Sequence, residues 1–246
     1  MPPISAVIIA RDEEARIGPA VASVRPWVDE VLVLDGGSSD DTVGVASRGG
    51  ARVESWPFDG FVTQKQRATD LALHDLIFSL DADERVDRAL GEALRAAGSP
   101  SGGGRRVRRL NYLDGAVLRA SGWGRDTPLR LFDRRDARWG GADPHDRVIA
   151  DGPEGPLLDG ALHHDPDRTT AAYVRATVAH ARRAARTIAA RGRPGPLAPA
   201  AHAAAHLARK LVWGAAMLDG RRGLTVAWVG TLGVARKYRL ARSERP

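Results

Sequence analysis

Three acids, at positions 81, 83 and 84, follow directly on an apolar run in the segment LIFSLDADERV (76–86). Carboxylates this close repel one another strongly unless a positive charge lies between them. Divalent cations such as Mg²⁺ bind carboxylate oxygens and share the rest of their coordination shell with phosphate oxygens. The chain has no cysteine that would favour a softer metal. The segment therefore predicts a divalent ion, Mg²⁺ or Mn²⁺, bound together with a diphosphate.

The same acids also allow a structural interpretation, in which Asp81 and Asp83 cap a helix or pair with Arg85 and Arg88. A D-x-D pattern is too short to exclude that role on its own. Its position favours function, because two other apolar runs also end in acids. These acids are Asp12 to Glu14, and Asp35. If the runs are parallel strands, all of these acids lie at the sheet edge where α/β proteins bind ligands.

Four apolar runs alternate with helical patterns along the first hundred residues. The runs are rich in β-branched residues and cover 5–10, 29–35, 51–58 and 76–80. Such alternation is typical of parallel strands joined by helical crossovers. It predicts an α/β fold with a mostly parallel sheet and helices on both faces. The segment 128–141 is expected to add strand pairs.

Charge divides the chain into two parts. Residues 1–166 contain 21 Lys and Arg against 27 Asp and Glu, a net charge of −6, whereas residues 167–246 contain 16 against 3, a net charge of +13. From Thr169 onward the pattern is that of three helical segments. We expect a catalytic domain over 1–166, followed over 167–246 by a basic, amphipathic helical tail.

The tail suggests contact with a membrane surface. Its apolar run 224–235 has 12 uncharged residues, fewer than the about 20 that a spanning helix needs. Arginines flank this run, and Trp213, Trp228 and Tyr238 suit the depth of the lipid headgroups. We expect helices lying on an anionic membrane, although they could equally pack on the catalytic domain. The start of the chain does not resemble a signal peptide, so a cytoplasmic protein at the inner face of the membrane is expected.

Several motifs together resemble glycosyltransferase family 2. Over residues 4–87 they are VIIARDEEARI, VLVLDGGSSDDT, QKQRATDLAL and IFSLDADERV, in the family's order. The segments 128–148 and 217–240 are similar to the bacterial branch that adds glucose to the lipopolysaccharide inner core. The resemblance implies a nucleotide-diphospho-sugar transferase fold (GT-A, Rossmann-like) and a UDP-sugar donor, UDP-glucose in this branch. It also implies a membrane glycolipid as acceptor.

The resemblance also implies how the donor is bound. Ala10, Arg11 and Glu13 would line the uridine pocket, and Asp35 would bind the base or ribose. Two departures from the family pattern affect this pocket. Arg11-Asp12 replaces the usual tyrosine-asparagine pair, which removes a base-stacking ring. The usual DDGS loop is DGGS here, so Asp35 is the only acid left in it.

The diphosphate and the metal would be held by residues near the opening motif. By the resemblance, Asp83 is the main protein ligand of the ion, and Asp81 contacts the ribose or the metal-bound phosphates. Lys65 is the only lysine among the first 209 residues and could neutralise the diphosphate, as could Arg67. Alternatively, Lys65 belongs to a solvated helix face. The family has a Gln-Lys pair ahead of its fourth strand, which Gln64-Lys65 matches here. This match favours the functional role.

An inverting sugar transfer needs a carboxylate that takes the proton of the acceptor hydroxyl. The branch has a histidine-glutamate pair where this chain has His145-Asp146, so Asp146 is the expected base, with Asp143 as the second candidate. His145 would position the acceptor or the diphosphate. Alternatively, the stretch is an ordinary loop with an Asx turn.

Trp123 and Arg130 are candidates for the acceptor pocket, although Trp123 fits a core equally well. For the adjacent His163 and His164 we expect a structural role or a contact to the diphosphate. His202 and His206 are expected on the surface of the tail.

Three other functions compete with this interpretation. A transferase acting on polyprenyl phosphate or on a protein would have a similar donor site. A non-catalytic nucleotide-binding or nucleic-acid-binding protein would use the basic tail, but no recognisable nucleic-acid module is present, so no nucleic-acid partner is expected. A nucleotidyltransferase would carry a basic, glycine-rich loop after the first strand, where this chain has acids.

Overall fold

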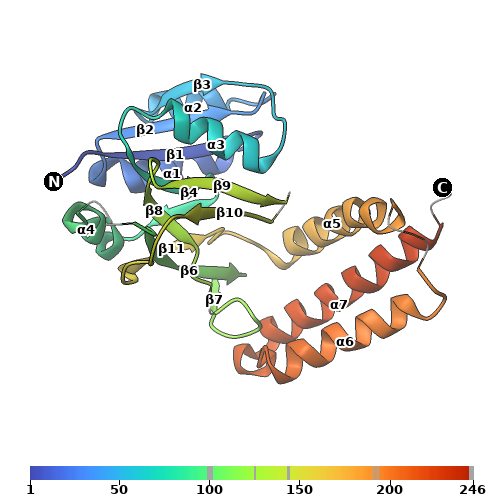
Figure 1. The fold of residues 1–246 in the computed structure, drawn as a ribbon. Helices are drawn as coiled ribbons and strands as arrows, with labels where there is room; N and C mark the ends of the chain where they lie inside the picture. Colours follow the sequence, from blue (N-terminus) through green and yellow to red (C-terminus); the bar gives the residue numbers. More distant parts are fainter. Residues whose placement is uncertain (99–101, 125, 143–144, 191, 193, 244–246) are drawn as a thin grey trace. The chain divides into compact units, whose positions relative to one another are not determined.

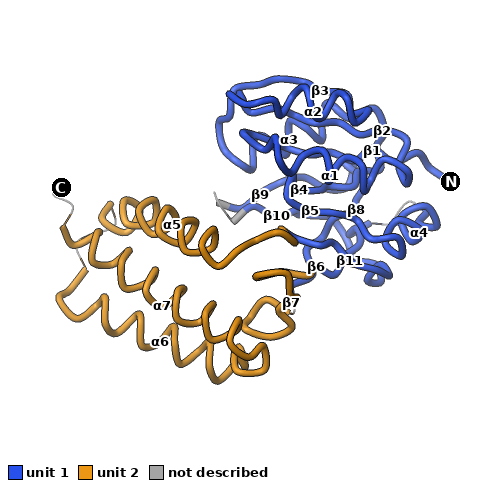
Figure 2. The backbone as a smooth tube through the Cα atoms, turned by 180° about the vertical axis from the view of Figure 1, so that it is seen from behind, with its two compact units in different colours: residues 1–109, 126–164 blue, residues 110–125, 165–246 orange. Residues whose placement is uncertain are grey.

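The structure is a computed structural model that describes residues 1–98, 102–124, 126–142, 145–190, 192 and 194–243 (Figure 1). The chain forms two compact units (Figure 2). Unit 1 contains residues 1–109 and 126–164, and unit 2 contains residues 110–125 and 165–246. The functional division after residue 166 stays a prediction.

Four parallel strands form one half of the sheet of unit 1. They are β1 (Ile4–Ala10), β2 (Glu30–Asp35), β3 (Arg52–Ser55) and β4 (Leu76–Asp81), in the order β3-β2-β1-β4. β2 is buried at every position, as its apolar run predicts. Ala10 is in register with Asp35, and Ile9 with Asp81. The strand ends that carry acids therefore lie at one edge of the sheet, as expected.

The other half of the sheet is antiparallel. β8 (Leu129–Asp133) lies antiparallel to β4 and is followed across the sheet by β6 (Arg105–Leu113), β11 (Leu158–His164) and β5 (Glu84–Val86). The short strand β7 (Ala116–Leu118) pairs with β6, and β9 (Ala137–Ala142) forms a separate hairpin with β10 (His145–Ala150). The predicted α/β class is confirmed, in a sheet that is parallel in its first half and antiparallel in its second.

Helices cover both faces of the parallel half, as predicted. Ile8 of β1 belongs to a core shared with α1 (Glu14–Val24) and α4 (Arg88–Ala96), whereas Val7 belongs to a second core with α3 (Phe61–Leu71) and β9. Neighbouring residues of a strand point to opposite faces. The remaining short helices of unit 1 are α2 (Thr42–Arg48) and the 3₁₀ turn η1 (Arg25–Trp27).

Unit 2 contains the three helices predicted for the tail. They are α5 (Thr170–Ala190), α6 (Ala198–Val212) and α7 (Gly220–Ser243), with the 3₁₀ turn η2 (Ala216–Asp219) between α6 and α7. α7 packs against both other helices, and it approaches them through glycines. A Cβ on Gly233 would lie 2.4 Å from Thr177 of α5, and one on Gly230 would lie 3.0 Å from His206 of α6. No helix in the described part of the chain is both long and apolar enough to cross a bilayer.

Candidate active site

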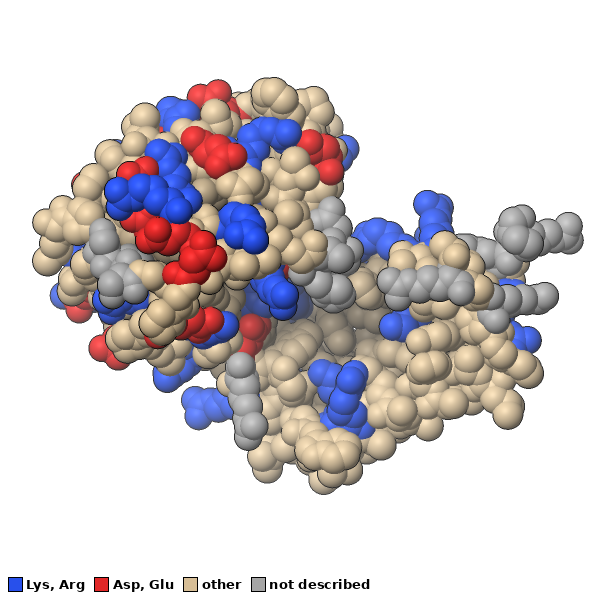
Figure 3. Space-filling view, in the orientation of Figure 1, with Lys and Arg blue, Asp and Glu red and all other residues tan. Residues whose placement is uncertain are grey.

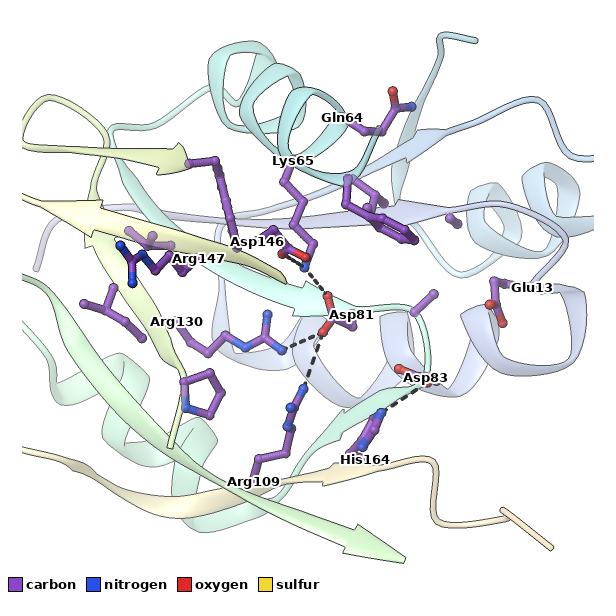
Figure 4. Close-up of a pocket in the computed structure, with 18 of the residues that line it drawn as sticks. Glu13, Gln64, Lys65, Asp81, Asp83, Arg109, Arg130, Asp146, Arg147 and His164 are labelled. Atoms are coloured by element: carbon purple, nitrogen blue, oxygen red, sulfur yellow. Dashed lines mark hydrogen bonds and ion pairs between the residues drawn. The ribbon is translucent and has the colours of Figure 1, made fainter. Parts of the chain in front are cut away.

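Unit 1 contains a cavity of about 990 Å³ at the edge where the parallel strands end, a size typical of ligand sites. Eight of the residues assigned a binding or catalytic role from the sequence line it (Figure 4). They are Ala10, Arg11, Glu13, Lys65, Asp81, Asp83, Arg130 and Asp146. The topology therefore brings together residues that are up to 136 positions apart in the chain.

Lys65 joins two of the acids in this cavity. Its Nζ atom lies 2.9 Å from Oδ1 of Asp81 and 2.8 Å from Oδ2 of Asp146 (Figure 4). The ammonium group also lies 4.8 Å from the ring centre of Trp139. Lys65 is buried, so the alternative of a solvated helix face is wrong. Asp146 lies on strand β10, not in the ordinary loop that the sequence also allowed.

Arg130 holds Asp81 from the other side. Its Nη2 atom lies 2.6 Å from Oδ2 of Asp81 and 2.7 Å from Oε1 of Glu84. Arg109 extends this network, because its guanidinium lies 3.3 Å from Glu84 and 2.7 Å from Asp126. The positive charge required beside the acidic motif is therefore supplied partly by the protein itself. Arg88, one of the partners considered from the sequence, pairs with Glu92 instead, at 2.8 Å.

The charges of this network shift its pKa values. Burial by itself would raise the pKa of Asp81, but Arg130 and Lys65 outweigh it and hold that pKa well below its usual range. Burial likewise would lower the pKa of Lys65, and the carboxylate of Asp81 reverses the effect, so that the pKa is raised. For Glu84 burial prevails and the pKa is raised. Asp81 is therefore held in its ionised form.

Asp83 has a different partner, His164 at the end of β11. Nε2 of His164 lies 3.4 Å from Oδ2 of Asp83, and both residues line the cavity (Figure 4). Burial would raise the pKa of Asp83, but the hydrogen bond and charge of His164 lower it. Over the described residues, no three His, Asp or Glu side chains come close enough to hold a metal ion by themselves. Asp83 nevertheless offers carboxylate oxygens at the cavity, the donors that Mg²⁺ and Mn²⁺ prefer, and His164 lies against it.

Asp35 lies outside the lining of the cavity. Its buried carboxylate accepts hydrogen bonds from the backbone N–H groups of Gly37, at 3.0 Å, and Ser38, at 3.1 Å. In the structure it therefore orders the DGGS loop that follows β2.

Two further sequence candidates are Trp123 and His145. Trp123 belongs to unit 2 and packs edge-on against Tyr173, with 5.5 Å between the ring centres, so it takes the core position that the sequence also allowed. His145 begins β10, but its side chain lies outside the described part of the structure, as does all of Asp143.

Two residues of the site that were given no role from the sequence are Arg109 and Trp139. Glu84 was noted as part of the acidic motif, but not as the partner of Arg109 and Arg130. Sequence reasoning named His164 only for a structural or diphosphate role. A signal for Arg109 was present, because four arginines crowd into residues 105–109 and the acidic motif needed cations. Trp139 gave no signal, because an isolated tryptophan in a strand is ordinary core composition.

A comparison with known sequences assigns a family to the first part of the chain. Residues 5–111 match the model of the family described as Glycosyl transferase family 2, which includes β1 to β4, the acidic motif and Lys65. These residues form a glycosyltransferase family 2 domain, and the resemblance seen in the sequence is confirmed.

Two relatives extend this comparison. An uncharacterized glycosyltransferase of Rickettsia felis is 45% identical over 94 residues, which are 38% of this chain and 33% of that protein. The lipopolysaccharide core biosynthesis glycosyltransferase LpsC of Rhizobium meliloti is 32% identical over 177 residues, 66% of this chain and 63% of that protein. The chain thus spans about a third of the length of the Rickettsia relative that it matches.

Among solved structures, glucosyl-3-phosphoglycerate synthase from Mycobacterium tuberculosis, in complex with Mn²⁺, UDP and glucosyl-3-phosphoglycerate, is 28% identical. The match covers 45% of this chain and 44% of that one, with a TM-score of 0.36. This score is too low to carry a structural argument.

Proposed function

We propose that this protein is an inverting, metal-dependent glycosyltransferase. It would move a sugar, glucose from UDP-glucose, onto a membrane glycolipid such as the lipopolysaccharide inner core. The observation that carries the proposal is the meeting of Asp81 and Asp146 at one buried lysine, inside a cavity large enough for a nucleotide sugar. The family 2 domain supports the reaction class, and the similarity to LpsC supports the acceptor class.

Asp146 is the proposed base. The oxygen of the acceptor hydroxyl attacks the anomeric carbon of the donor sugar while its proton passes to the Asp146 carboxylate. The bond between that carbon and the diphosphate oxygen breaks, and UDP leaves with the bonding electrons. The new bond forms on the opposite face, so the configuration inverts. Asp146 lies on β10, where it is paired with Gly141 of β9, and a strand position suits a group that must meet the hydroxyl in one geometry.

Lys65 and Arg130 would serve the donor side. Lys65 stabilises the Asp146 carboxylate by charge and adds a positive charge near the departing diphosphate. Arg130 keeps Asp81 ionised and fixed. Arg130 and Trp123 were expected in an acceptor pocket. That role remains a proposal for Arg130, whereas the packing of Trp123 supports a structural role.

The uridine part of the donor would lie against the end of β1. Ala10, Arg11 and Glu13 all border the cavity, which supports this placement. The proposed contact of Asp35 with the base or ribose would be made through the loop that its carboxylate orders. His145 remains a candidate for positioning the acceptor.

A divalent ion, Mg²⁺ or Mn²⁺, would be held by Asp83 with His164, and Asp81 would lie beside it. When bound, such an ion neutralises charge on the diphosphate of the donor. Both proposed donors face the cavity, and the remaining coordination positions suit phosphate oxygens and water.

The experiment is a panel of nucleotide sugars with Mg²⁺ or Mn²⁺, scored by thermal shift and by slow donor hydrolysis. UDP-glucose should give the largest stabilisation and should be cleaved. The variant Asp146→Asn should still bind the donor but transfer sugar about 10²–10⁴-fold more slowly. Asp159→Asn, an exposed position of β11, is the matched control and should be unaffected.

Two results would contradict the proposal. UDP-sugars that neither stabilise the protein nor are cleaved would remove the proposed donor class. Unchanged transfer by Asp146→Asn would remove the base, and would favour an acceptor that is already ionised, such as polyprenyl phosphate.

A further inference from the structure

Unit 2 exposes large apolar side chains where α6 turns into α7. Val212 is 71% exposed, Trp213 84%, Met217 67% and Leu218 82%. We call these four residues the apolar corner. A cluster of large apolar side chains in water marks an interaction site more often than single exposed residues do.

The apolar corner is held in a defined conformation. The carboxylate of Asp219 accepts hydrogen bonds from the backbone N–H of Arg119, at 2.8 Å, of Ala120, at 2.9 Å, and from the hydroxyl of Ser121, at 2.7 Å. Nζ of Lys210 donates to the carbonyl oxygen of Ser121 at 2.6 Å. These bonds fix both ends of the segment 211–218. Its apolar side chains therefore point outward from an ordered backbone.

A second apolar surface lies on α7. Leu224, Trp228 and Leu232 are each about half exposed, at 45%, 57% and 52%, and their spacing of four places them on one helix face. We call them the apolar stripe. The residues beside them, Val226 and Ala227, are buried, so the stripe is the outer side of a helix already packed on its inner side.

The charges around these surfaces are positive. Exposed arginines occur at 209, 221, 222, 236 and 239. In the described part of α6, η2 and α7 the only acid is Asp219, and its carboxylate is occupied by the bonds given above. Over these helices, the face shown in Figure 3 is tan with patches of blue. Apolar side chains flanked by cations suit a binding partner whose surface is both apolar and negatively charged.

We propose that the apolar corner and the apolar stripe insert into the surface of an anionic lipid bilayer. Trp213 and Trp228 would lie at headgroup depth, and the arginines would bind lipid phosphates. The inference rests on the proposed function for its purpose, which is to bring the enzyme to a lipid-linked acceptor. Its evidence, however, lies entirely within unit 2.

This picture differs from the one expected from the sequence. The uncharged run 224–235 was expected to lie along the membrane with Tyr238 at the interface. Part of that run is buried against the other helices, and Tyr238 stacks on His202 with 4.0 Å between the ring centres. His206 is also not a free surface residue, because its Nδ1 lies 3.1 Å from the hydroxyl of Thr231.

The test is flotation of the full chain with vesicles of phosphatidylcholine, alone or mixed with phosphatidylglycerol. The protein should float with the anionic vesicles and bind neutral ones at least about tenfold more weakly. The variants Leu218→Glu and Trp213→Ser should each lose about tenfold of this binding. Trp228→Ser tests the stripe in the same way.

Leu197→Glu is the matched control. Leu197 is 77% exposed and precedes α6 at the opposite end of the helix from the corner, so this variant should bind vesicles as the original chain does. Donor hydrolysis is measured for every variant and should be unchanged, which also shows that unit 1 is folded. Thermal unfolding identifies any variant in which unit 2 is not folded.

Three results would overturn the inference. The first is that a chain that hydrolyses its donor does not float, and the second is that the corner and stripe variants float as the original chain does. The third is that Leu197→Glu loses as much vesicle binding as those variants. Sedimentation equilibrium provides a fourth result that would overturn the inference. If Leu218→Glu converts a dimer into a monomer without changing flotation, the corner is an interface between two copies. Flotation without donor hydrolysis would instead contradict the proposed function and leave this inference standing.

Discussion

Lys65 is the residue on which the proposed chemistry depends most. It is buried and lies between two carboxylates with different proposed roles, Asp81 beside the donor and Asp146 beside the acceptor. Charges in such a site interact more strongly than on the surface, because water screens them less. A change at this one position should therefore affect both halves of the site.

The prediction at this residue concerns charge and geometry separately. Lys65→Met should lower kcat/KM for transfer about 10²-fold or more, because it removes a charge beside the reacting groups, and should lower the melting temperature. Lys65→Arg keeps the charge and should recover stability but little activity, since a planar guanidinium cannot replace a compact ammonium group. Transfer kinetics and thermal unfolding measure the two effects. Normal transfer by Lys65→Met would contradict the role.

The sequence predicted the members of this site better than their pairing. Lys65, Asp81 and Asp146 were each singled out for a different reason: Asp81 by its place at the end of a strand, Lys65 as the only lysine among the first 209 residues, and Asp146 by family resemblance. That Lys65 meets Asp146, 81 residues further on, depends on the path of the β9–β10 hairpin, which no local pattern reveals. Arg109 was not singled out, because arginine is used throughout the chain.

Among the elements, the parallel strands are tied together at the edge opposite the cavity. The carboxylate of Glu30, the first residue of β2, accepts hydrogen bonds from the hydroxyl of Ser5 at 2.5 Å, from Nη2 of Arg52 at 2.7 Å and from the backbone N–H of Leu73 at 2.7 Å. It thus joins β1, β2, β3 and the loop before β4. Burial would raise the pKa of Glu30, but these bonds outweigh it and the pKa is lowered.

The prediction at this scale is a stability that depends on pH. Glu30→Gln should lower the free energy of unfolding at pH 7 by about 2 kcal/mol, because it weakens bonds to a buried charge. A lowered pKa contributes stability above the unfolded value of about 4.3, and this stability is lost as the pH falls through the folded value. The difference between the two proteins should therefore shrink in acid, as denaturant unfolding at pH 7, 5 and 3.5 would show.

Glu54→Gln is the control for that experiment. Glu54 pairs with the same Arg52 at 2.8 Å, but its side chain is 45% exposed. Exposed ion pairs contribute little, so the change should cost less than about 1 kcal/mol. Equal effects of the two substitutions would show that Glu30 does not hold the strands together.

The elements with a strong local pattern were predicted correctly. The parallel strands β1 to β4 and the three helices of unit 2 follow from apolar runs and helical spacing. The strands β5 and β11 were not predicted. β5 has only three residues, too few to show a period. β11 pairs with β5, about 75 residues earlier in the chain, so its partner cannot be inferred locally.

For the whole molecule, the division into units differs from a simple domain followed by a tail. Residues 110–125 belong with the helices. Leu113 and Leu118 are buried and form a small core with Val226 of α7. A protein cut after residue 166 would lose α7 and expose those leucines.

The prediction is that a chain of residues 1–166 aggregates and binds a hydrophobic dye, because it exposes an apolar core.

A second design joins 109 to 126 with a short glycine linker and ends at 164. The backbone N–H of Arg109 donates to the carbonyl oxygen of Asp126 at 2.8 Å, so the two ends already meet. This design should remain monomeric in size-exclusion chromatography. Monomeric behaviour of the simple truncation would contradict the expectation.

The chain passes between the two units three times, after residues 109, 125 and 164. If the polypeptide were divided into 1–109 and 110–246, neither fragment would contain all of unit 1. The first piece would hold β1 to β4, and the second would hold β8 to β11. Sugar transfer regained on mixing such fragments would report their reassembly, which would make the enzyme a natural candidate for a split reporter.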